Sequence, residues 1–168
     1  MADTLTDLFS GLIQVKMVFT RLDNQELGYA QNKKNATTIY SLADGSASGE
    51  AESVYAAQRT APAAGIDSVD LLNLQQDNLG STVSFSFAKL RVLRVVNKSP
   101  TAGEYIYFGA SETNPTQSFA IAVGPGSEAL IVNHIDNYEV VSGNNVLRTY
   151  NPNATPVDYE LYLIGSPA

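Results

Sequence analysis

Alternation of apolar and polar residues is the clearest pattern along this chain, and it predicts β-strands. From residue 157 to residue 164, apolar or aromatic residues recur at every second position. Residues 104–109 repeat the pattern, with tyrosines on one side and Ile106 and Phe108 on the other. Because side chains of a strand point alternately to its two faces, this period of two indicates strands with one buried face.

The stretch 67–97 holds two strand-like apolar runs around a polar turn at residues 77–80. Only Arg91 and Arg94 interrupt the second run, residues 90–96. With Lys89 and Lys98 they are the nearest approach to a basic patch, and we expect all four at solvent-facing or rim positions of a strand. The stretch specifies a sheet and carries no nucleophile, metal cluster or phosphate loop.

Turn residues divide the rest of the chain at regular intervals. Glycine, proline and asparagine clusters separate short runs rich in β-branched and aromatic residues. We expect the run 138–141 to pair with 146–150 as a hairpin. The predicted strands are residues 37–42, 53–60, 68–74, 82–87, 90–96, 104–109, 119–123, 129–132, 138–141, 146–150 and 157–164. Short strands at this spacing predict an all-β fold, an antiparallel β-sandwich or jelly roll.

The N-terminal part combines two patterns. Leu5, Leu8, Phe9 and Leu12 fall at helical spacing, and residues 15–20 then alternate like a strand. Residues 23–34 are polar and predict a loop. We therefore expect residues 1–40 to form an arm or short helix with a first strand, and residues 41–168 to form the sandwich body, together one domain.

Composition narrows the function classes. The net charge is -7, which argues against nucleic acid as a partner, because phosphate binding needs clustered lysine and arginine. The absence of cysteine excludes disulfides and zinc–thiolate sites. No signal peptide is visible at the start of the sequence, and no run approaches the roughly 20 apolar residues of a membrane helix, so we expect no membrane partner.

Candidate chemistry is sparse. His134 is the single histidine, next to Asp136, and a loop or strand-end role fits it better than a general base or metal ligand. Ser48 lies in a glycine-flanked run that lacks the pattern of a nucleophile elbow. Asp67, Asp70 and Asp77 do not form a calcium loop, and Asp136 with Glu139 is a weak candidate for a glycosidase pair. We expect no enzyme activity, catalytic residue, metal or cofactor.

Tyrosine is abundant, with nine residues in the chain. Tyrosines bury area while keeping a polar tip, so they are frequent at interfaces, and they are also ordinary strand residues. The sequence therefore allows two interpretations for these tyrosines: positions in the core or at its rim, or contacts between subunits. Tyr105 and Tyr107 are our candidates for the contact role.

The order of several short segments resembles a family of small β-rich virion proteins of tailed bacteriophages. The resemblance covers residues 41 to 165, and its segments are Leu42-Ala43-Asp44-Gly45, Ala51-Glu52-Ser53-Val54-Tyr55, Arg59-Thr60, Ser68-Val69-Asp70-Leu71, Phe87-Ala88-Lys89-Leu90-Arg91, Val123-Gly124-Pro125-Gly126, residues 138–143, Asp158-Tyr159-Glu160-Leu161 and Ile164-Gly165. The polar residues 133–136 and the first 40 residues depart from that pattern. The resemblance implies a structural role in the virion.

From this resemblance we expect a capsid decoration (cement) protein on the exterior of the capsid of a virion assembled in the bacterial cytoplasm. Its expected partners are the major capsid protein and further copies of itself, in a homo-oligomer that we expect to be a trimer. The expected contact residues are Leu5, Leu8, Phe9, Leu12, Tyr105 and Tyr107. The alternative is a tail or fibre component, one that could bind a host glycan.

Overall fold

The computed structural model describes residues 11–25, 28–78, 81–109, 121–133, 135, 138–143 and 145–167, and these residues contain strands and turns but no helix. The strands are β1 Gly11–Gln25, β2 Gly28–Asp44, β3 Glu50–Ala51, β4 Ser53–Ala61, β5 Gly65–Asp70, β6 Leu74–Asn78, β7 Ser81–Phe85, β8 Phe87–Asn97, β9 Ile106–Phe108, β10 Ile121–Val123, β11 Glu128–Val132, β12 Tyr138–Glu139, β13 Val146–Asn151 and β14 Val157–Pro167. The expected all-β class is confirmed.

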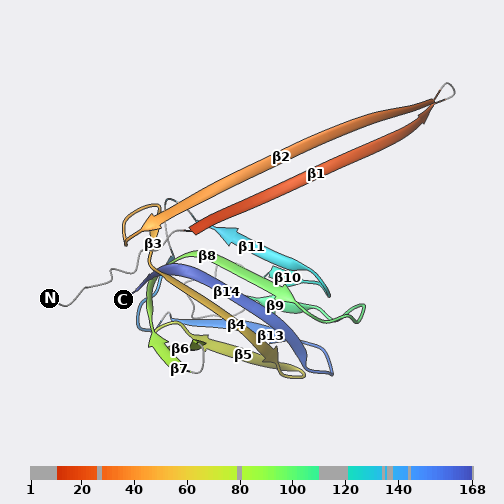
Figure 1. Cartoon of the computed structure of the whole chain (residues 1–168). Helices are drawn as coiled ribbons and strands as arrows, with labels where there is room; N and C mark the ends of the chain where they lie inside the picture. Colours follow the sequence, from red (N-terminus) through yellow and green to blue (C-terminus); the bar gives the residue numbers. More distant parts are fainter. Residues whose placement is uncertain are drawn as a thin grey trace.

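Two antiparallel sheets face each other and form the body (Figure 1). The first has the order β11-β8-β14-β4, with β12 also paired to β8, and the second has the order β10-β9-β13-β5. In chain order the pairs are nested: β9 pairs with β10, β8 with β11, β5 with β13 and β4 with β14. Nested pairs of this kind, rolled into two sheets, are the topology of a jelly roll.

The core lies between the two sheets and is apolar. Strand β14 contributes alternate residues to it, as the sequence pattern predicts, and Leu161, Leu163 and Tyr159 of this strand are fully buried. Two buried asparagines at strand ends fix the neighbouring loops. Asn97 donates to the carbonyls of Glu104 and Val123 at 2.8 and 2.9 Å.

Asn151 plays the same part at the end of β13. Its amide nitrogen donates to the carbonyls of Ala61, Pro62 and Thr155 at 3.1, 3.0 and 2.8 Å. Its oxygen accepts from the backbone amide of Asn153 at 2.9 Å. A buried side-chain amide that bonds several loop carbonyls fixes the conformation of those loops, because any movement that breaks one of these hydrogen bonds leaves a buried polar group unpaired.

The hairpin of β1 and β2 leaves the body as a long two-stranded arm (Figure 1). The loop expected at residues 23–34 is wrong, because β1 runs to Gln25 and β2 begins at Gly28. A ribbon that projects from the body does not have to bury one face, so its polar residues give no strand signal. The division expected after residue 40 falls inside β2, which continues to Asp44.

The helix expected over residues 5–12 is wrong at its C-terminal end. Gly11 and Leu12 belong to β1, where Leu12 lies opposite Ser41 of β2. Pairing with β2 along the whole of β1 overrides the local helical spacing. Leu5, Leu8 and Phe9 lie outside the described residues.

Two further strand predictions are corrected. The predicted hairpin of 138–141 with 146–150 does not form, since β12 pairs with β8 and β13 lies in the other sheet. The predicted strand 68–74 is interrupted after Asp70. The Asp70 carboxylate accepts from the amide of Leu72 at 3.0 Å and from Asn73 at 2.7 Å, so the aspartate caps a turn that alternation alone cannot reveal.

Candidate interaction surface

The base of the arm is a small hydrophobic cluster on the outer face of the first sheet. Leu42 of β2, Ala51 of β3 and Val92 of β8 are buried together there. Four partly buried side chains pack against these three, and they are Ile13, Leu130, Val132 and Ile164. The sheet therefore buries apolar residues on both faces, the inner face in the core and the outer face under the arm.

Arg91 fastens the loop that joins the arm to the body. Its side chain is 1% exposed, and its guanidinium donates to the carbonyls of Ala47 at 2.6 Å, Glu50 at 3.3 Å and Ile135 at 3.4 Å. Ser166 adds a hydroxyl donor to the carbonyl of Gly45 at 3.3 Å. The joining loop is thus held by side chains of β8 and β14, not only by its own turn.

The expectation that Arg91 faces solvent or lies at a rim is wrong, because the joining loop covers its side chain, and a β-bulge lies at this position. Ile164 of β14 lies opposite Val92, whereas the next residue, Gly165, lies opposite Leu90, so the register shifts at Arg91. A bulge inserts one residue and redirects side chains. The backbones of β8 and β14 also lie close together at the bulge, since a Cβ on Gly165 would lie 1.9 Å from the carbonyl oxygen of Lys89.

Cross-strand register arranges the outer face of the first sheet into rows. The row nearest the arm is aliphatic, and it consists of Val132, Val92, Ile164 and Val54. The next row consists of Leu130, Arg94, Tyr162 and Ala56, and the third consists of Glu128, Val96, Glu160 and Gln58. The face changes from apolar under the arm to charged away from it.

A groove of about 360 Å³ lies on this face beside the arm base. Its lining is Ile13, Gln14, Val92, Arg94, Glu128, Leu130, Tyr162 and Ile164. Arg94 crosses it, with Nε 2.9 Å from a carboxylate oxygen of Glu128 and the guanidinium 5.0 Å from the centre of the Tyr162 ring. We use the name outer-face groove for this groove together with the second and third rows of the outer face. It has the apolar floor and charged rim of a protein-binding surface.

Of the two candidate tyrosines, Tyr107 lies on β9 of the second sheet and Tyr105 directly precedes that strand, and neither is in the core. Tyr107 is 37% exposed and lies opposite Tyr150, with ring centres 6.3 Å apart. Ile66 continues the row on β5 and is also exposed. Tyr105, 46% exposed, covers Gly124. A short exposed aromatic row therefore crosses the sheet that does not bear the arm.

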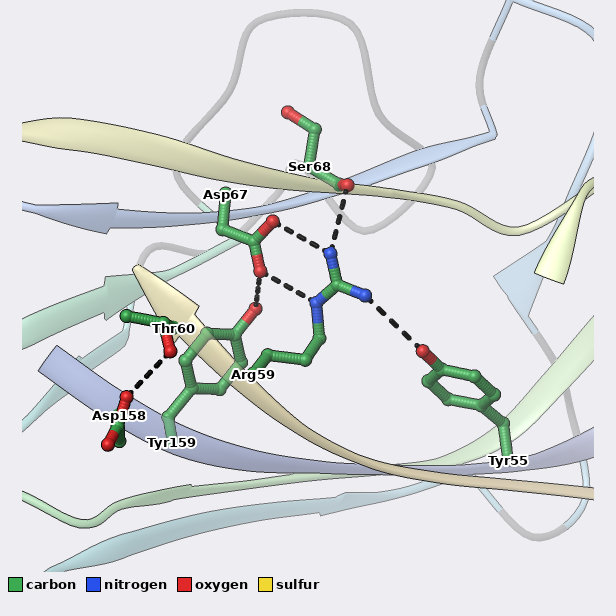
Figure 2. A network of polar contacts seen from close by, with 7 residues as sticks. All are labelled: Tyr55, Arg59, Thr60, Asp67, Ser68, Asp158 and Tyr159. Atoms are coloured by element: carbon green, nitrogen blue, oxygen red, sulfur yellow. Dashed lines mark hydrogen bonds and ion pairs between the residues drawn. The ribbon is translucent and has the colours of Figure 1, made fainter. Parts of the chain in front are cut away.

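An ion pair joins the two sheets where β4 turns into β5 (Figure 2). Asp67 accepts from Arg59 at 2.6 and 2.7 Å and from the Tyr159 hydroxyl at 2.7 Å. Burial alone would raise the pKa of Asp67, but the hydrogen bonds from Arg59 and Tyr159 outweigh it and lower that pKa. The hydrogen bond to Asp67 raises the pKa of Arg59, and burial raises the pKa of Tyr159. The three side chains therefore hold the two sheets together, and each is engaged in a hydrogen bond with another of the three.

The other candidates for chemistry either make structural hydrogen bonds or lie outside the described residues. The Ser48 hydroxyl donates to the carbonyl of Ile135 at 2.5 Å. Asp70 caps its turn, and His134 and Asp136 lie outside the described residues, as does any pairing of Asp136 with Glu139. Within the described ranges no group of three or more His, Asp or Glu residues is placed to hold a metal ion.

No protein-family model, curated protein or solved structure matches this chain. Among the residues that the structure describes, there is no helix of the length and apolar character needed to cross a membrane. Sequence reasoning missed the buried Arg91 and the outer-face groove. A signal for the first was present: core residues Leu90 and Leu93 are out of phase with strict alternation, as expected at a bulge.

Proposed function

We propose that this protein is a structural component of a tailed bacteriophage virion, a decoration protein that binds the outer shell of the capsid and stabilises it by bridging capsid subunits. The observation that carries the proposal is a jelly-roll body with a projecting two-stranded arm whose base is fastened to the body. Jelly rolls recur in viral capsid and lectin domains, and a projecting arm is suited to contacting a neighbour.

The proposed mechanism is stabilisation through many small contacts. Each copy binds the assembled shell and not the dissociated subunits, so binding shifts the equilibrium toward the shell. A homo-oligomer, with a trimer as the expected form, would multiply weak contacts by avidity. We assign the contacts with the major capsid protein or with neighbouring copies to Leu5, Leu8, Phe9 and Leu12 before and within the arm, and to Tyr105 and Tyr107.

The copy number of the protein per virion tests this function, measured by quantitative mass spectrometry against the major capsid protein. Hundreds of copies are expected for a decoration protein. About a dozen copies or fewer would place it at a tail or portal ring and refute the proposal. Heat release of DNA from particles with and without the protein provides the second measurement, and particles lacking it should open at a lower temperature.

A second candidate is a tail or fibre component that binds a host glycan, and the exposed row of Tyr107, Tyr150 and Ile66 is the observation that favours it. Exposed aromatic rings provide stacking surfaces for ligands. A glycan array with the native protein and with Tyr107→Ala measures this directly. Binding that the substitution abolishes supports the candidate, and an array without binding rejects it.

A further inference from the structure

The arm is a two-stranded ribbon with little support beyond its base. Within the described residues, β1 pairs only with β2, and β2 pairs outside the hairpin only with β3, at Ala43 and Asp44. The paired segment from Lys16 to Gln25 extends about 30 Å at the usual rise of a strand. Because an isolated hairpin is marginally stable in water and exposes unpaired edges, a ribbon of this kind is typical of a segment that binds a second surface.

Charge indicates which surface that is. Residues 16–34 of the arm contain four basic and two acidic residues, a net charge of +2. Residues 45–168 contain six basic and twelve acidic residues, a net charge of -6. Two arms would therefore repel each other, whereas an arm and the body of another copy attract.

The outer-face groove is the part of the body that best fits an arm. It lies beside the arm base and has an apolar floor in Val92, Leu130 and Ile164. Acidic residues on and beside it, Glu128, Asp158 and Glu160, outnumber the two basic residues there, Arg94 and Lys98. The arm of the same copy points away from this face beyond its base (Figure 1), which leaves the groove open to another chain.

We infer that the arm of one copy lies in the outer-face groove of a second copy. Since each copy has one arm and one groove, exchange closes either as a reciprocal pair or as a ring. This inference deepens the self-association included in the proposed function and rests on that part of it. It does not depend on the capsid contact, which a solution experiment leaves out.

The first test is the mass of the protein in solution, measured by sedimentation over a range of concentrations. The matched variant replaces residues 17–36 with Asn-Gly, because Lys16 and Thr37 lie opposite each other and a two-residue turn can join them. This variant keeps Ile13 and Leu42 at the base. The native chain should be oligomeric and the shortened chain monomeric. A native chain that is monomeric at about 100 µM, or a shortened chain that keeps its mass, would overturn the inference.

A full-length variant covers the case in which the shortened chain fails to fold. Lys33→Glu with Lys34→Glu changes the arm from a net charge of +2 to -2. Association should weaken by about tenfold or more, and Lys33→Gln with Lys34→Gln should fall between this variant and the native chain. Equal association of all three proteins contradicts the inference.

Crosslinking then identifies the contact, and the cysteine-free chain gives a clean background. A Thr20→Cys copy, with the cysteine in the arm, is mixed with an Ala56→Cys copy, with the cysteine on the exposed outer face, and treated with a short bismaleimide. The mixture should give a crosslinked pair. Thr20→Cys alone and its mixture with Thr101→Cys, in an exposed turn elsewhere, should not. Efficient crosslinking of Thr20→Cys alone would indicate arm-to-arm pairing and overturn the inference.

The two proposals fail separately. Normal incorporation into virions by a chain that is monomeric in solution would reject the arm exchange and leave the decoration role standing. Arm exchange in solution by a chain present in only a few copies per virion would do the reverse.

Discussion

Arg91→Met should be among the most destabilising single substitutions of a polar residue in this protein. Methionine keeps much of the apolar stem of the arginine in the same buried space but removes every donor. The carbonyls of Ala47 and Glu50, which hold the loop between arm and body, then lose the guanidinium that binds them. The expected consequence is a less stable protein with a loosened arm base.

The magnitude follows from the number and length of the bonds. A hydrogen bond from a charged donor is worth about 1.5–3 kcal/mol. One of the three carbonyl bonds is short, at 2.6 Å, and two are long, at 3.3 and 3.4 Å. We therefore expect a loss of about 3–5 kcal/mol, a large share of the roughly 5–15 kcal/mol that stabilises a typical domain.

Arg94→Met is the matched control, because Arg94 lies on the same strand and undergoes the same chemical change. Its ion pair with Glu128 is exposed, with 38% and 51% of the two side chains accessible. Exposed pairs contribute about 0–1 kcal/mol, so this variant should unfold close to the native protein. Arg91→Lys keeps the positive charge but has fewer hydrogen-bond donors, so its free energy of unfolding should fall between those of Arg91→Met and the native protein.

Urea unfolding followed by far-ultraviolet circular dichroism measures the free energies, and amide hydrogen exchange locates the change. In Arg91→Met, protection should fall at the amides of Ala43 and Glu50, which bond within the joining loop. The reasoning is refuted if Arg91→Met lies within about 1 kcal/mol of Arg94→Met, or if those two amides keep their protection.

Three further predictions concern the body. Gly165→Ala should destabilise by about 1–3 kcal/mol, because its Cβ would lie 1.9 Å from the carbonyl oxygen of Lys89, and an unchanged urea midpoint would contradict the close approach. Asn151→Ala should lower stability by about 2–4 kcal/mol, since three loop carbonyls lose one donor, and unchanged exchange in the loop 152–156 would count against this. The pKa of Asp67 is lower in the folded state than its ordinary value of 3.8, so the stability that its charged form contributes is present above pH 3.8 and is lost as the pH falls below that value. The difference in unfolding free energy between the native protein and Asp67→Asn should therefore shrink on acidification. A constant difference would refute the assignment.

The fold class was accessible from the sequence because most body strands bury one face. Residues 157–164 and 104–109 alternate cleanly; the first lies within β14 and the second contains β9 at Ile106–Phe108, both with alternating burial. Alternation gives the buried face but not the partner strand, which is why β12 and β13 seemed to form a hairpin although they lie in different sheets. Pairing is decided by the rolled topology of the whole chain.

The candidate site was less predictable, for a physical reason. Residues of the arm need not face a core, so the polar stretch 23–34 looks like a loop although it contains paired strand residues. Arg91 looks like a surface residue because it is charged, whereas the loop between arm and body covers it and accepts its hydrogen bonds at the carbonyls of Ala47 and Glu50. Both errors arise where the chain leaves regular, one-sided burial, and both lie at the proposed interaction surface.

The arm and the body are energetically one unit at the arm base. The aliphatic row of Val132, Val92 and Ile164 would be open to water without Leu42 and Ala51, and burial of apolar area is worth about 25 cal/mol per Å². Deleting the arm entirely would therefore expose an apolar face and confuse loss of binding with loss of stability. A variant that shortens the ribbon beyond Lys16 and Thr37 preserves this cluster and the Arg91 contacts, so any change in association can be attributed to the projecting part.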